Sequence, residues 1–116
     1  MKIVRIYTGS DEKSHFEDID LPFATAGESE TTPLQDTKAV RFNYYQPGYL
    51  LEWHCAPQRQ YVVNLAGQAE IEIGDGTVRQ FSPGDVLLAE DLTGQGHITR
   101  VVGNKTRVSM WVTLES

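Results

Sequence analysis

Apolar and polar residues alternate along most of this 116-residue chain, and turn-forming residues interrupt the alternation at short intervals. An alternation with a period of two places successive side chains on opposite faces of a β-strand. No stretch repeats apolar residues with the helical period. We predict strands at residues 2–7, 15–19, 38–45, 49–54, 59–66, 68–73, 77–81, 86–89, 97–102 and 106–114, with a loop over 21–36. Many short strands separated by Gly, Pro and Asn predict an all-β sandwich or barrel.

The composition excludes several classes of function. The formal net charge is −6, from 10 basic and 16 acidic residues without a Lys/Arg cluster, which disfavours nucleic acid as a partner. No apolar run approaches the roughly 20 residues of a membrane span, and no signal peptide opens the chain. The single cysteine, Cys55, cannot form an internal disulfide. We therefore expect a cytoplasmic protein that does not bind membranes.

The length fits one structural domain with one core. We divide it into residues 1–36, N-terminal strands and a loop at the barrel edge or in a dimer contact, and residues 37–116, the barrel. Several strands carry a second, half-apolar face opposite the face that holds their polar residues, and Tyr61, Val63 and Leu65 form one such face. A single small barrel cannot cover these faces itself. We therefore expect a homodimer, formed by strand addition or by sheet packing.

The segment 47–67 carries polar residues where an ordinary buried strand would carry aliphatic ones. It reads as two strands joined by a turn around Pro57. On alternating strands, one face would hold Leu50, Glu52 and His54 before the turn and Gln60, Val62 and Asn64 after it. Polar groups on an inner face are costly unless they are paired or functional. We therefore place the candidate site here.

The spacing of glycine and histidine in this segment carries a family resemblance. Gly48 is followed after five residues by His54, and the later positions of the same motif hold Ala56, Gln60 and Gly67. A Pro-Gly-Asp turn at 83–85, a strand and then His97 form a second motif. Together these motifs resemble the cupin superfamily, as a small single-domain cupin of unassigned activity. The resemblance implies a jelly-roll β-barrel, also called a double-stranded β-helix.

The same resemblance suggests a metal site. In metal-bearing cupins, two His and one Glu of the first motif and the His of the second hold the ion. Here the matching positions leave His54, Gln60 and His97, because Ala56 supplies no ligand. Glu52 lies two residues before His54, about 6 to 7 Å along a strand. If it faces the lumen, His54, His97 and Glu52, with Gln60, would hold one divalent metal, and Zn, Fe, Mn and Ni fit this set equally.

A metal-free pocket is the second interpretation. His54, tuned by Glu52, would act as acid or base, while Gln60 and Asn64 orient a small polar molecule. The walls of this substrate pocket would come from Phe42, Tyr44, Thr99 and Trp111. Two further alternatives stay open: a fully paired polar network without a ligand, and a non-catalytic ligand-binding or regulatory module. The leading prediction is binding or turnover of a small polar molecule inside the barrel, with or without the metal.

Other polar residues have simpler interpretations. We expect Cys55 to face away from the lumen as an inert thiol. Asp91 lies in the loop before His97, where an acidic residue is usually exposed. Arg59 and Arg100 should point outward, and a bulge that turned either of these two inward would favour an acidic ligand.

Overall fold

A computed structural model describes residues 2–115, and these residues form strands without any helix. In that part of the chain, therefore, no helix is long and apolar enough to cross a membrane. The strands are β1 (Lys2–Thr8), β2 (Ser14–Asp20), β3 (Ala24–Ala26), β4 (Ser29–Thr31), β5 (Thr37–Tyr45), β6 (Leu50–His54), β7 (Gln60–Ala66), β8 (Gln68–Glu72), β9 (Val78–Phe81), β10 (Val86–Glu90), β11 (His97–Val102) and β12 (Arg107–Leu114).

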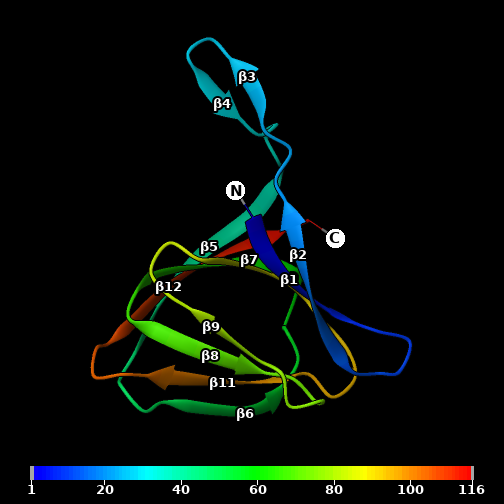
Figure 1. Ribbon diagram of the computed structural model, residues 1–116, viewed down its shortest axis with the longest axis vertical. Helices are drawn as coiled ribbons and strands as arrows, with labels where there is room; N and C mark the ends of the chain where they lie inside the picture. The colour runs from blue at the N-terminus through cyan, green and yellow to red at the C-terminus, as the bar shows by residue number, and fades with distance from the viewer. Residues whose placement is uncertain (1, 116) are drawn as a thin grey trace.

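Two sheets face each other and enclose the interior (Figure 1). The larger sheet has the order β2-β1-β10-β7-β12-β5, and the smaller has the order β6-β11-β8-β9. Strand β1 pairs in parallel with β10, and the other pairs are antiparallel. This arrangement confirms the predicted all-β jelly roll. Each of the ten strands predicted from alternation begins and ends within one residue of an observed strand. The short strands β3 and β4 were not predicted.

The hydrophobic core occupies one part of the space between the sheets. Its buried side chains come from both sheets and from the segment after β6, and they are Ile6, Ala56, Ile71, Ile73, Phe81, Leu87 and Ala89. Burial of such side chains contributes roughly 1.5–3 kcal/mol each, so this cluster is a main source of stability. Four of its members, Ala56, Ile71, Leu87 and Ala89, also line the cavity described below.

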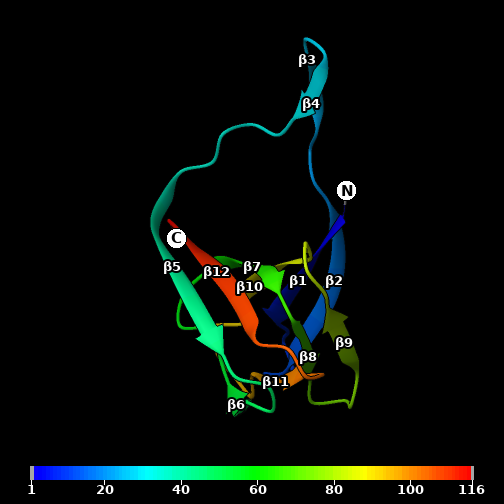
Figure 2. The same ribbon diagram turned by 90° about the vertical axis from the view of Figure 1, so that its left-hand side faces the viewer.

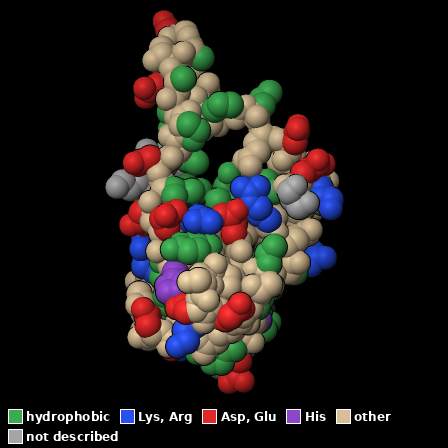
Figure 3. Space-filling view, turned by 90° about the vertical axis from the view of Figure 1, so that its right-hand side faces the viewer, with side chains coloured by type: hydrophobic (Ala, Val, Ile, Leu, Met, Phe, Trp, Pro, Cys, Tyr) green, Lys and Arg blue, Asp and Glu red, His purple; other side chains and the backbone are tan. Residues whose placement is uncertain are grey.

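Residues 21–36, predicted to be a loop, contain the short hairpin β3–β4, which stands away from the body (Figures 1 and 2). We call residues 21–36 the arm. All residues of both its strands are exposed. The segment of the arm that follows β4 is hydrogen-bonded to the larger sheet: the Tyr61 hydroxyl of β7 donates to Oε1 of Gln35 at 2.8 Å. Figure 3 shows hydrophobic side chains on the arm and on the body beneath it, around an opening between the two.

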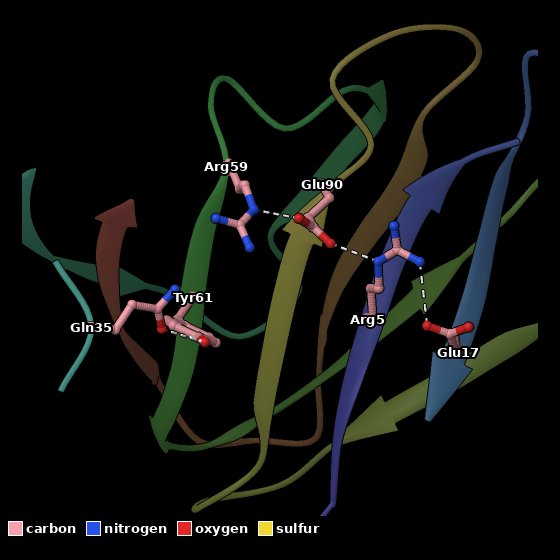
Figure 4. Close-up of polar contacts among 6 residues, drawn as sticks. All are labelled: Arg5, Glu17, Gln35, Arg59, Tyr61 and Glu90. Carbon is pink, nitrogen blue, oxygen red and sulfur yellow. Dashed lines mark hydrogen bonds and ion pairs between the residues drawn. The ribbon is translucent and has the colours of Figure 1, made fainter. Parts of the chain in front are cut away.

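Ion pairs fix one end of the larger sheet across four neighbouring strands (Figure 4). Glu90 on β10 accepts hydrogen bonds from Arg59 and, at 2.6 Å, from Nε of Arg5. Arg5 also contacts Glu17 on β2 at 3.3 Å. Burial alone would raise the pKa of Glu90, but the two arginines outweigh it and hold the pKa below its usual value. Arg59 is therefore engaged on the outer face, away from the barrel interior.

Candidate functional site

A cavity of about 250 Å³ lies between the two sheets. Most of its surface is apolar, and the polar groups that reach it are few. It is lined by Tyr45, Tyr49, Leu51, His54, Ala56, Pro57, Gln60, Val62, Ile71, Leu87, Ala89, His97, Thr99, Arg107 and Trp111. Concave, mainly apolar cavities with a few convergent polar groups are typical of small-molecule sites. This volume is small and suits a compact ligand.

His54 and His97 lie side by side on the cavity wall. The two residues are register partners on β6 and β11, and their ring centroids are 4.3 Å apart. Gly96 makes this approach possible, because its φ is +76° and a Cβ there would lie 2.0 Å from the carbonyl oxygen of His54. The two sequence motifs that hold His54 and His97 therefore bring their imidazoles together in the structure.

Asp91 and Ser14 orient His97 from behind. Nδ1 of His97 lies 2.6 Å from Oδ2 of Asp91, and the Ser14 hydroxyl donates to the same oxygen at 2.7 Å. Asp91 is 0% exposed and Ser14 is 2% exposed. A carboxylate accepts hydrogen bonds only, so Nδ1 of His97 carries the proton and Nε2 is left as the free ring nitrogen.

His54 is oriented in the same sense by the backbone. Its Nδ1 donates to the carbonyl oxygen of Glu52 at 2.7 Å, which leaves Nε2 as a base. Burial lowers the pKa of His54, and this effect outweighs the hydrogen bond to the Glu52 carbonyl, which raises it. At neutral pH, His54 is therefore an uncharged imidazole with an available lone pair.

The side chain of Glu52 does not line the cavity, contrary to the expected shared face. The pairing of β6 with β11 is irregular: His54 faces His97 but Leu51 faces Thr99, so three steps along β6 match two along β11. An extra residue in one strand reverses the side on which the following residues point. Consequently Leu51 and His54 both line the cavity, and Glu52 is exposed.

Gln60 and Asn64 are both buried, at 2% and 1% exposure, but only Gln60 lines the cavity. Within residues 2–115, Oε1 of Gln60 is buried and has no hydrogen-bond partner. Asn64 is instead held by the backbone, since its Nδ2 donates to the Gly67 carbonyl at 2.8 Å. Its Oδ1 accepts a hydrogen bond from Nε of Arg107, which does reach the cavity.

The aromatic wall differs from the expected one on strand β5. Phe42 and Tyr44, expected to wall the pocket, are 66% and 68% exposed on the outer face. The register of β12 explains this, because Arg107 and Trp111, which line the cavity, lie opposite Tyr45 and Arg41. Tyr45 and Tyr49 line the cavity instead. Thr99 and Trp111, which the sequence also predicts in the pocket wall, do line the cavity.

The remaining candidates lie away from the cavity. Cys55 donates to the carbonyl oxygen of Gly94 at 3.3 Å, and burial, with the charge of Asp91, raises the pKa of its thiol. A raised pKa keeps the thiol protonated and unreactive. Arg100 pairs with Glu72 on the outside of the smaller sheet.

The polar groups of the cavity do not form a metal site of the expected kind. Across residues 2–115, no group of three or more His, Cys, Asp or Glu side chains is placed to hold a metal ion. The cavity offers two imidazole nitrogens and the neutral amide of Gln60, while the Glu52 carboxylate is outside and Asp91 is engaged behind His97. A cationic side chain, Arg107, lines the same space. Transition-metal sites usually contain at least three strong donors, often with a compensating anion, and this set does not supply them.

Sequence reasoning missed three groups of this site, namely Asp91, Ser14 and Arg107. For Arg107 a signal existed, because it lies on the same strand face as Trp111, which was expected in the pocket. For Asp91 and Ser14 no local signal exists, since 77 residues separate them in the chain.

Comparisons with solved structures identify the fold. No protein-family model matches the sequence, and no curated protein matches it. An uncharacterized conserved protein with a double-stranded β-helix domain from Klebsiella pneumoniae is similar, with 23% identity, a TM-score of 0.52 and coverage of 77% of this chain and 78% of that one. The Cnp3 cupin domain of Schizosaccharomyces pombe has 12% identity, a TM-score of 0.55 and coverage of 98% and 84%. The chain therefore has the double-stranded β-helix fold of the cupins.

Proposed function

We propose that this protein binds a small polar molecule in the barrel cavity and that His54 serves there as an acid–base group without a metal. The observation that carries the proposal is the pair of adjacent imidazoles, each with Nδ1 bonded to an oxygen and Nε2 left free. Such fixed tautomers are what proton transfer to or from a bound molecule requires. The neutral state of His54 gives it the lone pair of a base at neutral pH.

The support from Asp91 extends the proposal to His97. The hydrogen bond from Nδ1 to a buried carboxylate holds the His97 ring in one orientation. A bound molecule would then meet two oriented imidazoles, with His54 as the base and His97 as a hydrogen-bond partner. Gln60 would orient that molecule through its unpartnered Oε1.

A non-catalytic ligand-binding or regulatory module is the alternative function. Its walls would be the same, and the imidazoles would only donate or accept hydrogen bonds. The apolar character of most of the cavity surface favours binding in either case. The two functions differ in whether a molecule that binds is also converted.

Replacing His54 with asparagine should reduce turnover of any converted molecule by about 10²- to 10⁴-fold, since that is the usual contribution of a general base. Asparagine can keep the hydrogen bond to the Glu52 carbonyl through its amide nitrogen, so the fold should hold. We would measure thermal shifts with a panel of small polar molecules, and then conversion of each that binds. His15→Asn, a half-exposed histidine outside the cavity, is the matched control.

The results separate the interpretations. Equal conversion by wild type and His54→Asn would contradict the acid–base role. Binding that depends on His54 without any conversion would favour the module. A stoichiometric transition metal in the purified protein, lost in both His54→Asn and His97→Asn, would replace the metal-free proposal by the metal site.

We also propose that the protein forms a homodimer through the outer surface of the larger sheet. Strands β5, β12 and β7 lie side by side there (Figure 2), and apart from Lys38 at the start of β5 their outward side chains are uncharged. Eight of them are Val40, Phe42, Tyr44, Val63, Leu65, Val108, Met110 and Val112. We call these eight residues the outer apolar face. A face of this kind on three neighbouring strands resembles the core of an interface rather than a solvated surface.

The exposed area supports a second copy of the chain as the partner. The accessible surface is 6914 Å², whereas a compact monomer of this mass would expose about 6300 Å². The excess of about 600 Å² is three-quarters of the area of about 800 Å² that one partner buries in a standard interface. The arm adds a further argument, because a hairpin of two three-residue strands is only marginally stable alone. Packing against a second copy would supply its missing contacts.

Phe42→Glu should convert the dimer to a monomer, raising its dissociation constant by about 100-fold or more, because a buried unpaired carboxylate is costly. Sedimentation equilibrium would measure the change. Val78→Glu places the same charge on an exposed valine of the smaller sheet and should leave the dimer intact. A wild-type protein that is monomeric at all concentrations tested would refute the dimer.

A further inference from the structure

Arg107 is a buried cation at the cavity wall. Its side chain is 6% exposed, its Nε donates to Oδ1 of Asn64 at 2.8 Å, and its guanidinium carbon lies 5.7 Å from the centre of the Tyr45 ring. Within residues 2–115, it has no carboxylate at ion-pair distance, whereas carboxylates do pair with Arg5, Arg59, Arg79 and Arg100. Arg41 has no such partner either, but it is exposed, so within residues 2–115 Arg107 is the buried arginine without a counter-ion.

The charge of Arg107 is not removed by its burial. Desolvation lowers the pKa of Arg107, but a guanidinium starts so high that it stays protonated in proteins. An unpaired buried charge is unfavourable unless something compensates it. Neither the Asn64 amide nor the Tyr45 ring supplies a negative charge, so the compensating group is missing from the described part of the chain.

We propose that Arg107 binds the carboxylate of a small ligand in this cavity, which makes the ligand a monocarboxylic acid with an apolar body. This inference rests on the proposal that the cavity binds a ligand and adds its chemical class. A planar guanidinium matches a carboxylate through two parallel hydrogen bonds. One cation balances one negative charge, whereas a phosphate dianion would need a second. The apolar walls suit the rest of the molecule.

The position of Arg107 sets how such a ligand lies. Arg107 begins β12 and follows directly on the turn that ends β11, while His97 is the first residue of β11. The arginine and the imidazole pair thus enter the cavity from opposite ends of β11. A carboxylate held at Arg107 therefore directs the remainder of the molecule along the apolar walls toward His54 and His97.

Matched acids and amides test the inference. The probes are benzoate, phenylacetate and isovalerate, each against its neutral amide, and inorganic phosphate, with affinities from isothermal titration calorimetry on the full chain. We expect at least one acid to bind wild type and its amide to bind more weakly. Arg107→Met should weaken binding of that acid by about 10- to 100-fold, the effect of hydrogen bonds between charged groups. Arg107→Lys keeps the charge but cannot form two parallel hydrogen bonds to a carboxylate, so its affinity for the acid should lie between those of wild type and Arg107→Met.

Arg79→Met is the control, because it removes one arginine that pairs with Asp18 and does not line the cavity, and it should leave the affinity unchanged. Thermal melts of each variant show whether it is folded, and Arg107→Lys provides the comparison if the methionine variant is not. Equal binding of acids and amides, failure of every acid to bind, or tighter binding of phosphate than of any acid would overturn the inference.

His54→Asn in the same titrations distinguishes this inference from the proposed function. Acid binding that is lost in Arg107→Met, while turnover does not depend on His54, leaves the carboxylate site standing and removes the acid–base role. Ligand binding and turnover that depend on His54 but not on Arg107 leave the acid–base role standing and remove the carboxylate site.

Discussion

Alanine in place of Gly96 should reduce the free energy of unfolding by roughly 3 kcal/mol. A residue with a Cβ costs about 1–2 kcal/mol in the left-handed region, where Gly96 lies with φ +76°. The new Cβ would also lie 2.0 Å from the carbonyl oxygen of His54, so the loop or β6 must move. Forced displacement of a packed structure adds roughly 1–3 kcal/mol. Chemical denaturation followed by tryptophan fluorescence measures the loss.

Gly103→Ala is the control for this prediction. Gly103 has φ +80°, but a Cβ there meets no atom within 4 Å. The variant should therefore lose only the conformational part, about 1–2 kcal/mol. An equal loss in both variants would mean that the contact between Gly96 and His54 does not constrain the fold. The displacement in Gly96→Ala should also separate the imidazoles and weaken any ligand binding that depends on them.

Removal of the Asp91 side chain by Asp91→Ala should cost about 2–6 kcal/mol of stability. The substitution leaves two buried donors without an acceptor, the Ser14 hydroxyl and Nδ1 of His97, and each unsatisfied buried group costs about 1–3 kcal/mol. The loss should be accompanied by disappearance of the imidazole N–H proton resonance of His97, which the hydrogen bond protects from exchange. Denaturation curves and proton NMR measure the two effects.

Asp36→Ala removes an exposed carboxylate from the arm and should change stability by no more than about 0.5 kcal/mol. Asp91→Asn adds a second comparison, because the amide oxygen can still accept both hydrogen bonds but carries no charge. A smaller loss than in Asp91→Ala would show that acceptor geometry accounts for part of the stability. If Asp91→Ala were as stable as Asp36→Ala, Asp91 could not be orienting His97.

The two faces of strand β5 show why alternation predicted the strands but misassigned some of their faces. Val40, Phe42 and Tyr44 are the more apolar set, and the sequence therefore predicts Phe42 and Tyr44 in the pocket wall, whereas the interior set includes Tyr45. Alternation indicates two faces and does not say which one points inward when both are partly apolar. An outer face that is itself apolar removes the signal on which the assignment depends.

Glu52 illustrates a different limit. A sequence pattern with a period of two assumes an unbroken strand, and the extra residue between Leu51 and His54 changes the side on which Glu52 points. No residue in this segment indicates such a bulge. The position of the Glu52 carboxylate therefore depends on pairing with β11, which the local sequence does not contain.

The sequence by itself determined the class of fold, because alternation and turn residues are local properties that specify strands and their ends. The family resemblance carried by Gly48, His54, Gly67 and His97 also implied that the two histidines share one site. Only the tertiary structure decided what surrounds them: Asp91 and Ser14 behind His97, Glu52 outside, and Arg107 unpaired at the cavity wall. These relations join residues far apart in the chain, and they depend on sheet register and burial, which no local pattern encodes.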